Sequence, residues 1–493
     1  MKRILVKLIS NVLGSVKTIG LPLGLGLIQL RGNALLIPIL LLSYQINYAQ
    51  TSDTDFARPL KEVIDELQGK YEVIIKYKEQ DIKDFNLRYA NWRLVPGNVE
   101  LSLKNVLAPF DYIFVKQGEG VYKIKPYQYH LITPEAGAES LEYLKTLYDD
   151  QESWEARKTE LKSCMIEALG LNDLQKEEKP NIILSNKRKY DGYQIENIAL
   201  ETVPGYYVTG SIYRPIKSKG KQPVIISPNG HFGDGRYRKN EQLRCAALAK
   251  MGAIVVSYDL FGWGESALMV ASTSHRKSIA HTIQTDNAIS LINYLLKDNK
   301  ADPNRVAITG GSGGGSQTML VSAIDDRISV SVPVVMTSSY HSGGCPCESG
   351  TPIHLCGERT NNAEIAAMFA PKPLLIISDG RDWTSQVPEV EYPFIQRTFG
   401  FYDAEDNVQN AHFAEEGHDY GLSKRTAMYR FMADELGLNL AAILDENGEI
   451  DESIITIEEY SEMYAFGKDG EKMPENAIKN LEELYEVLGK NED

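Results

Sequence analysis

The sequence predicts an α/β protein, with a doubly wound, mostly parallel sheet preceded by a small α+β domain. Three observations support this prediction. Apolar stretches such as residues 253–258 are typical of buried strands, and segments of helical length separate them. A glycine-rich turn at residues 310–315 joins one such stretch to a helix. A separate series of helix and strand patterns fills residues 55–130. The 493 residues leave room for both domains.

The first fifty residues have the pattern of an export signal. Three basic residues near the start precede a short apolar run at residues 34–42, which is too short to cross a membrane. A second apolar stretch at residues 21–30 leaves an uncleaved membrane anchor as the alternative. No cysteine precedes Cys164, which excludes a lipid-modified cysteine at the cleavage point. We expect a periplasmic or secreted protein, membrane-anchored if the signal is not cleaved, whose cysteines can pair.

Residues 55–130 form a small α+β pattern of their own. Apolar residues recur at helical spacing over 60–67, a strand pattern covers 71–77, and a second helix pattern covers 99–107. Residues 112–125 carry a hairpin signal around Gln-Gly-Glu-Gly. This order resembles the short N-terminal domain of secretins and TonB-dependent receptors. The resemblance implies contact with an envelope protein and no catalytic group; the alternative is an exported spacer.

Three further segments complete the predicted organisation. Residues 133–180 are charged and helix-rich, typical of a connector that packs on the neighbouring catalytic domain. Residues 181–440 hold the alternating strands and helices of that catalytic domain, with strands predicted at 224–227, 253–258, 328–335 and 373–377. Residues 441–493 form an acidic C-terminal extension, in which sixteen carboxylates and four lysines follow position 444, and we expect a solvated tail or surface.

The strongest catalytic signal surrounds Ser312. An apolar strand pattern at residues 305–309 leads into Gly-Gly-Ser-Gly-Gly, and a helix pattern follows from residue 316. Strand, G-x-S-x-G and helix together are the nucleophile elbow of α/β-hydrolases, so Ser312 is the predicted nucleophile. We expect the backbone N–H of Gly313 to bind the oxyanion together with a donor near Gly230 or His231, which follow the strand at 224–227.

The acid and the base should follow the serine in the chain, because α/β-hydrolases have the order Ser, acid, His. Asp379 and Asp382 both follow the strand at 373–377, and Asp382 is preferred because it lies past a glycine turn. His412 and His418 come later. His418 precedes a predicted helix at 423–436 in a polar loop, and we predict it as the base.

A set of short motifs in this order resembles the acetylxylan-esterase-like and dienelactone-hydrolase-like branch of α/β-hydrolases. They are Gly310 to Gly315, Ala370 to Leu375, Gly380 to Thr384, Pro388 to Pro393, and Gly417-His418. The resemblance spans residues 150–440. It implies ester hydrolysis on acylated plant polysaccharides or their oligosaccharides, with Ser312 as nucleophile, Asp382 as acid and His418 as base. Relatives with this fold also cleave methyl esters or peptides, which leaves the acyl group open.

Three cysteines lie close together in a loop after the strand at 328–335. A structural zinc site needs four soft ligands and usually has C-x₂₋₄-C spacing. Cys345 and Cys347 form C-x-C, and Cys356 is alone. We therefore expect no metal here, and a disulfide from Cys356 to Cys345 or Cys347.

The same loop is predicted to form a wall of the substrate site. Glu348 and Arg359 are its candidate substrate contacts, and Trp383 offers an aromatic face to a sugar at the mouth of the site. The sequence contains no phosphate-binding loop and no dinucleotide fingerprint, so the reaction is expected to need no cofactor. No basic patch indicates a nucleic-acid partner, and the net charge is −15.

The leading hypothesis is an exported serine esterase that removes small acyl groups, acetyl first, from plant polysaccharides or oligosaccharides. One alternative is a methyl esterase on uronic-acid glycans. Another is a peptidase of the prolyl-oligopeptidase type, although the chain is too short before residue 181 for the β-propeller of such enzymes and shows no repeat. The non-enzyme alternative is an envelope interaction protein with an inert hydrolase domain. The serine, acid and histidine candidates occur along the chain in the order of active α/β-hydrolases, which argues against an inert hydrolase domain.

Overall fold

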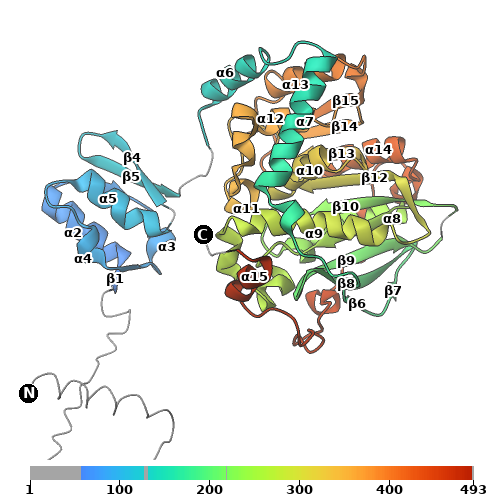
Figure 1. The fold of residues 1–493 in the computed structure, drawn as a ribbon, viewed down its shortest axis with the longest axis horizontal. Coiled ribbons are helices and arrows are strands. Elements are labelled where there is room, and N and C mark those ends of the chain that lie inside the picture. Colours follow the sequence, from blue (N-terminus) through green and yellow to red (C-terminus); the bar gives the residue numbers. More distant parts are fainter. Residues whose placement is uncertain (1–56, 111, 127–130, 218, 491–493) are drawn as a thin grey trace, which may run out of the picture. The chain divides into compact units, whose positions relative to one another are not determined.

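The computed structural model describes residues 57–110, 112–126, 131–217 and 219–490 (Figure 1). The chain divides into two compact units, Met1–Lys125 and Pro126–Asp493. The predicted export signal at 1–50 lies outside the described residues. Within the described ranges, no helix has both the length and the apolar character needed to cross a membrane.

The small unit contains two amphipathic helices and two small sheets. Helix α2 (Leu60–Tyr71) and helix α5 (Val99–Leu107) form where the apolar spacing lies, and their buried residues share one hydrophobic core. A three-stranded sheet has the order β2-β5-β4, and β1 pairs with β3. The remaining elements are β1 (Ala57–Pro59), β2 (Ile74–Lys76), α3 (Glu79–Ile82), β3 (Asn86–Arg88), α4 (Ala90–Arg93), β4 (Tyr112–Gly118) and β5 (Val121–Pro126). Its resemblance to the secretin and TonB short domain stays a prediction.

The large unit is built on one sheet of mixed direction, which confirms the predicted α/β architecture. The strand order is β15-β14-β13-β12-β10-β11-β9-β8-β6, and β7 also pairs with β8. Strands β10 to β15 are parallel, while β6 to β9 are antiparallel and join the sheet where β9 meets β11. The strands are β6 (Ile182–Leu184), β7 (Arg188–Lys189), β8 (Tyr193–Val203), β9 (Tyr206–Pro215), β10 (Gln222–Pro228), β11 (Ile254–Tyr258), β12 (Ala301–Gly311), β13 (Ile328–Val334), β14 (Leu374–Asp379) and β15 (Val408–Phe413).

Helices cover both faces of this sheet (Figure 1). Adjacent strand residues point to opposite faces, so Ile226 joins the core with α9 and α10, while Ile225 joins the core with α8 and α14. Burial on both faces explains why the parallel strands are continuously apolar. The covering helices are α8 (Lys239–Lys250), α9 (Ile279–Leu295), α10 (Gly313–Ile324), α12 (Asn362–Ala367), α13 (Glu391–Gly400) and α14 (Leu422–Leu436), with the short α11 (Pro346–Ser349) in a loop.

The predicted connector is an integral part of the large unit. Helix α6 (Pro134–Leu144) and helix α7 (Gln151–Ala168) contribute buried side chains to the same core as α9 and α10. The buried guanidinium of Arg157 pairs with Glu364 at 2.9 Å, and Cys164 forms a disulfide with Cys356. The predicted pairing of Cys356 with Cys345 or Cys347 is therefore wrong. The true partner lies 192 residues away, where no spacing pattern could indicate it.

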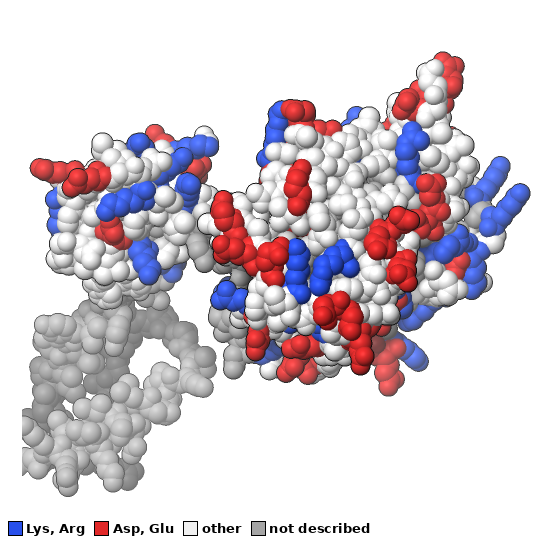
Figure 2. Space-filling model, turned by 90° about the horizontal axis from the view of Figure 1, so that it is seen from above, with Lys and Arg blue, Asp and Glu red and all other residues white. Residues whose placement is uncertain are grey.

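The acidic C-terminal segment packs on the sheet, and a solvated tail is the wrong description of it. Phe466 and Leu484 are fully buried, and they share a core with Tyr206 of β9. The carboxylate of Glu265 accepts hydrogen bonds from the backbone N–H groups of residues 465 and 466, both at 2.7 Å. Helix α15 (Leu481–Leu488) buries its apolar face in the same core. Glu482 and Glu486 of α15 are exposed. Acidic and basic groups are interspersed on the face of the molecule shown in Figure 2.

Candidate active site

The turn between β12 and α10 holds Ser312 in a conformation that L-residues rarely adopt. Its φ is 56° and its ψ is −124°, and its backbone N–H donates to the carbonyl of Val334 at 3.0 Å. Glycine is required beside it, because a Cβ on Gly314 would lie 2.4 Å from the carbonyl oxygen of Pro228. This strained, tight turn has the geometry predicted for the nucleophile elbow.

The structure brings Ser312, His418 and Asp382 into one hydrogen-bonded chain. Nε2 of His418 lies 2.9 Å from Oγ of Ser312, and Nδ1 lies 2.6 Å from Oδ2 of Asp382. The other carboxylate oxygen of Asp382 accepts hydrogen bonds from N and Oγ1 of Thr384, both at 2.6 Å. An ionised carboxylate only accepts hydrogen bonds, so Nδ1 of His418 carries the proton and Nε2 presents its lone pair to the serine.

Asp379 and His412, the two rejected candidates, have other partners. The Asp379 carboxylate is fully buried, lies 3.5 Å from Nζ of Lys424 and accepts the N–H of Arg381 at 3.1 Å. Burial raises the pKa of Asp379 to about 6, and the nearby Asp382 charge acts in the same direction. Nδ1 of His412 lies 2.9 Å from Oγ of Ser378 on the neighbouring strand. Neither side chain takes a place in the Ser312–His418–Asp382 triad.

The loop after β10 packs directly against the elbow. A Cβ on Gly230 would lie 3.1 Å from Cβ of Ser312 and 2.2 Å from the carbonyl of Gly311. A Cβ on Gly313 would lie 2.8 Å from the imidazole of His231. The first N–H groups of a helix have no acceptor inside the helix, and Gly313 is the first residue of α10. The loop of Gly230 and His231 thus forms the wall where an oxyanion would sit.

Trp383 stands between two histidines at the site. Its ring centroid lies 4.4 Å from that of His418 and 4.3 Å from that of His341. Burial, together with the neighbouring His418, lowers the pKa of His341 to about 4, so His341 is neutral at neutral pH. The contacts of Trp383 therefore support the His418 ring, and a sugar could contact only the remaining surface of this half-buried indole.

Glu348 and Arg359 were predicted substrate contacts, and the structure gives them different surroundings. Glu348 is buried, and its carboxylate accepts a hydrogen bond from Oγ of Ser316 at 3.1 Å. Its other oxygen lies 3.8 Å from Nδ1 of His231. Arg359 is exposed, and its carbonyl accepts a hydrogen bond from Arg157 of α7 at 2.9 Å. Glu348 thus lies behind the oxyanion wall, and the contacts of Arg359 lead to α7 and not to the triad.

A second cluster, which no sequence pattern predicted, lies beside the triad. His231, His275, Cys345 and Cys347 bring one nitrogen or sulfur atom each to within 4.8 Å of one another. The C-x-C pair of Cys345 and Cys347 was visible in the sequence, but no two further ligands lay at the spacing from it that is typical of metal sites. Those two are histidines on loops 70 and more residues upstream, and only the folded sheet brings the loops together.

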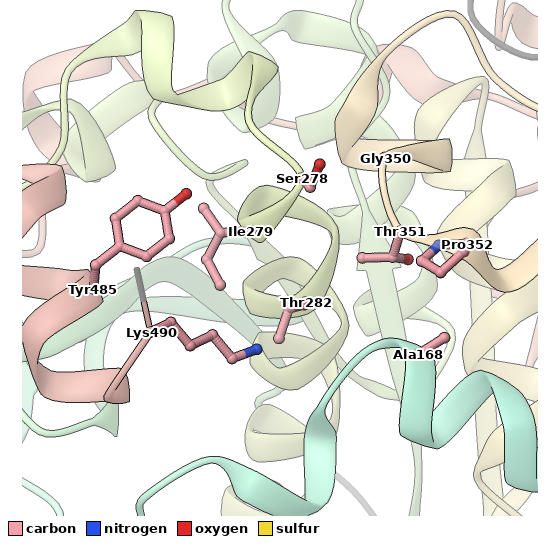
Figure 3. A pocket seen from close by; sticks show the side chains of 9 residues that line it. All are labelled: Ala168, Ser278, Ile279, Thr282, Gly350, Thr351, Pro352, Tyr485 and Lys490. Atoms are coloured by element: carbon pink, nitrogen blue, oxygen red, sulfur yellow. The ribbon is translucent and has the colours of Figure 1, made fainter. Parts of the chain in front are cut away.

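A hollow of about 440 Å³ lies elsewhere on the large unit (Figure 3). Residues from the end of α7, the start of α9, the loop after α11 and the C-terminal segment line it. They are Ala168, Ser278, Ile279, Thr282, Gly350, Thr351, Pro352, Tyr485 and Lys490. None of the predicted site residues is among them.

Comparison with known proteins places the chain among esterases. Methylesterase BT1017, a solved structure, is 49% identical, with a TM-score of 0.72, and the match covers 89% of this chain and 97% of that one. The chain belongs to the family of this methylesterase. The family model of the X-Pro dipeptidyl-peptidase (S15 family) matches residues 205–362, which include Ser312 and end before the acid and the base. These matches confirm the α/β-hydrolase fold and the prediction of a serine hydrolase of the esterase class.

More distant relatives match shorter parts. The Bacillus subtilis (strain 168) protein named "Putative hydrolase YtaP" is 23% identical over 156 residues, which are 29% of this chain and 50% of the relative. The chain thus spans about half the length of this curated relative. The acetyl xylan esterase from Paenibacillus sp. R4 is 18% identical, with a TM-score of 0.40, over 56% of this chain and 95% of that one. That likeness is too low to bear on the substrate.

Proposed function

We propose that this protein is a serine esterase that removes methyl groups from esterified uronic-acid glycans. The observation that supports it most is the 49% identity to a methylesterase over nearly the whole of that chain. The Ser312–His418–Asp382 geometry supplies the groups that ester hydrolysis requires. Removal of acetyl groups, the leading hypothesis from sequence, becomes the second candidate.

The triad accounts for each step of such a hydrolysis. Oγ of Ser312 attacks the ester carbonyl carbon while Nε2 of His418 takes the hydroxyl proton. The negative charge on the carbonyl oxygen is stabilised by the N–H of Gly313 and a donor near Gly230 or His231. Collapse of this intermediate expels the alcohol, which takes the proton from His418. A water molecule, activated by the same imidazole, then releases the carboxylic acid and restores Ser312.

A cation that packs on the aromatic neighbour of His418 favours the uronic-acid substrate over neutral acetylated xylan. The guanidinium of Arg238 lies 5.1 Å from the ring centroid of Phe232, and that ring lies 5.5 Å from the ring of His418. Within the described residues, Arg238 forms no ion pair. A partly esterified uronic-acid chain carries free carboxylates next to the reacting ester. Arginine binds such carboxylates with two parallel hydrogen bonds, whereas an acetylated neutral glycan offers none.

We also propose that the enzyme is exported and, on the resemblance of residues 55–130 to the secretin and TonB short domain, that the small N-terminal unit binds an envelope protein. The signal-like pattern of residues 1–50 supports export. The Cys164–Cys356 disulfide supports it as well, because disulfides persist in oxidising compartments. Fractionation of the source cells would test export, and retention of the enzyme in the cytoplasm would contradict it.

The decisive experiment measures both products in parallel. Purified enzyme is incubated with methyl-esterified uronic-acid glycans and with acetylated xylan, and methanol and acetate are quantified. We expect methanol release, little acetate release, and neither product with Ser312→Ala. Acetate release without methanol would replace the methyl assignment by the acetyl one. Full activity of the folded Ser312→Ala variant would contradict the triad itself.

The role of Arg238 has a separate test. We expect Arg238→Ala to raise KM roughly tenfold on partly esterified uronic-acid oligosaccharides, the effect of losing a contact worth about 1.4 kcal/mol. It should leave hydrolysis of a small neutral methyl ester unchanged. Arg238→Lys keeps the charge and should recover part of the affinity. An equal loss on both substrates would show that Arg238 supports the fold of the site and not the substrate.

A further inference from the structure

We propose that His231, His275, Cys345 and Cys347 bind a single transition-metal ion, with zinc the best fit, next to the predicted nucleophile. Two neutral imidazoles and two thiolates form the Cys₂His₂ ligand set of tetrahedral zinc sites. The four donor atoms lie within 4.8 Å of one another. The proposal of this metal site does not depend on which ester the enzyme hydrolyses.

The donor atoms lie near the separations of such a tetrahedron, since two measured distances are slightly too short and the widest is at most 4.8 Å. Zinc–nitrogen and zinc–sulfur bonds of about 2.0 and 2.3 Å place the donor atoms of a tetrahedral site about 3.3 to 3.8 Å apart. Nε2 of His231 lies 2.8 Å from Nε2 of His275 and 3.1 Å from Sγ of Cys347. Inserting an ion would move these atoms apart by less than about 0.6 Å, which rotation about side-chain torsions can supply.

The outer contacts aim both histidines at the same point. Nδ1 of His275 lies 2.7 Å from the carbonyl oxygen of Phe261. A carbonyl only accepts, so Nδ1 carries the proton and Nε2 offers a lone pair to the cluster. Nδ1 of His231 faces the buried carboxylate of Glu348 at 3.8 Å. A histidine that binds metal usually gives its other N–H to a carbonyl or carboxylate. His275 has this arrangement with Phe261, whereas the carboxylate of Glu348 lies near His231 but beyond hydrogen-bond distance. Glu348 thus acquires a role that its position behind the pocket wall left unexplained.

The ion would tie three separate loops at the carboxyl edge of the sheet. His231 follows β10, His275 lies in the 3₁₀ segment Ser272–Arg276 after β11, and the two cysteines open α11 after β13. Four protein ligands leave no open position, so the site is structural and not catalytic. His231 packs on Gly313, so a metal that fixes His231 also fixes the wall where the oxyanion sits.

Two metal-free states compete with this proposal. One is a disulfide between Cys345 and Cys347, which both have free thiols in this structure. The other is a direct hydrogen bond between the two histidines, which the 2.8 Å separation also permits. Both predict that the purified protein takes up no metal.

The test uses the purified full chain, with metal content measured by elemental analysis and cobalt substitution followed by absorption spectroscopy. We expect one equivalent of zinc per chain, and after exchange the charge-transfer and d–d bands of tetrahedral, thiolate-bound Co²⁺. The Cys345→Ser/Cys347→Ser double variant should lose the metal. Cys245→Ala removes the other buried free cysteine, outside the cluster, and should keep it.

Several results would overturn the proposal. One is a metal content below about a tenth of an equivalent per chain after growth with zinc. The others are the absence of cobalt absorption bands, and an intact mass that shows a second disulfide in freshly purified protein. Wild-type spectra decide the question even if the cysteine variants fail to fold. Ser312→Ala should keep its full metal content, so failure of the esterase assignment and failure of the metal site give different results.

Discussion

Oδ2 of Asp382 lies 2.6 Å from Nδ1 of His418, while Asp379, three residues earlier, turns to Lys424. Asp379 ends β14, and Asp382 lies in the loop that returns over the sheet edge. Thr384 holds the second oxygen of Asp382. The Asp382 carboxylate is thus held against the base, while the buried Asp379 carboxylate faces the Lys424 ammonium.

Asp382→Asn should lower kcat by about 10⁴-fold, because an amide at this position no longer selects the tautomer of His418 that accepts the serine proton. Asp379→Asn should lower kcat far less, since the His418 ring is hydrogen-bonded to Asp382 and Ser312 and not to Asp379. Steady-state rates on a small methyl ester, with far-UV circular dichroism to verify folding, check the comparison. A larger loss of kcat in Asp379→Asn would show that Asp379, and not Asp382, is the catalytic acid.

Ser312→Ala and Ser312→Gly should both lower kcat by at least about 10⁴-fold, because both remove the predicted nucleophile. They should differ in stability. At a φ of 56°, glycine is unstrained, whereas alanine keeps the strain of the native residue. We expect the glycine variant to have a free energy of unfolding about 1 to 2 kcal/mol above that of the alanine variant. Urea unfolding of the two variants measures this difference, and equal values would show that the elbow stores no strain.

The raised pKa of Asp379 predicts a pH-dependent stability. The folded-state pKa of about 6 lies above the unperturbed 3.8, so folding favours the protonated carboxyl. The stabilisation of the folded state by the protonated Asp379 carboxyl is fully present below about pH 4 and is lost as the pH rises through about 6. Asp379→Asn cannot ionise, so its melting temperature relative to wild type should rise between pH 4 and pH 6. Thermal melts at half-unit steps test this, and a constant difference would contradict the buried, protonated state.

Local rules were sufficient to predict the parallel strands β10 to β14 and to select the three side chains that the structure joins by hydrogen bonds. Burial on two faces makes each parallel strand continuously apolar, and the elbow needs glycines at fixed positions around Ser312. The order of serine, acid and histidine then restricts the choice to few residues. Strand β15 was not predicted because most of its side chains are half-buried and half of them are polar, so its sequence shows neither an apolar run nor a regular alternation.

What the sequence could not indicate depends on contacts between distant segments. Cys356 pairs with Cys164 because α7 packs on the loop after α11, and no local pattern encodes this. The four possible metal ligands likewise come from three loops that meet only at the sheet edge. The C-terminal segment looked solvated because its sixteen carboxylates far outnumber its four lysines, although apolar residues such as Phe466 and Leu484 anchor it.

The Cys164–Cys356 disulfide should stabilise the large unit. It closes a loop of 192 residues and so restricts the unfolded chain strongly. We expect Cys164→Ala/Cys356→Ala to lower the free energy of unfolding by about 2 to 4 kcal/mol, with kcat nearly unchanged because neither residue contacts the triad. Denaturant unfolding of the oxidised wild type and of the variant checks this. Identical midpoints would mean that α7 packing alone sets the stability.

The small N-terminal unit should be dispensable for chemistry, but the point of truncation matters. Leu131 forms a β-bridge with His341, and the N–H of Ile132 donates to the carbonyl of Tyr340 at 3.0 Å. His341 contacts Trp383, which in turn contacts His418. A chain that begins at Leu131 should therefore keep the wild-type kcat on a small ester, whereas one that begins at Pro134 should lose several-fold in kcat with little change in KM. Loss of most activity in the longer chain would show that the N-terminal unit helps to build the site, and equal activity of the two would show that the bridge to His341 does not position the base.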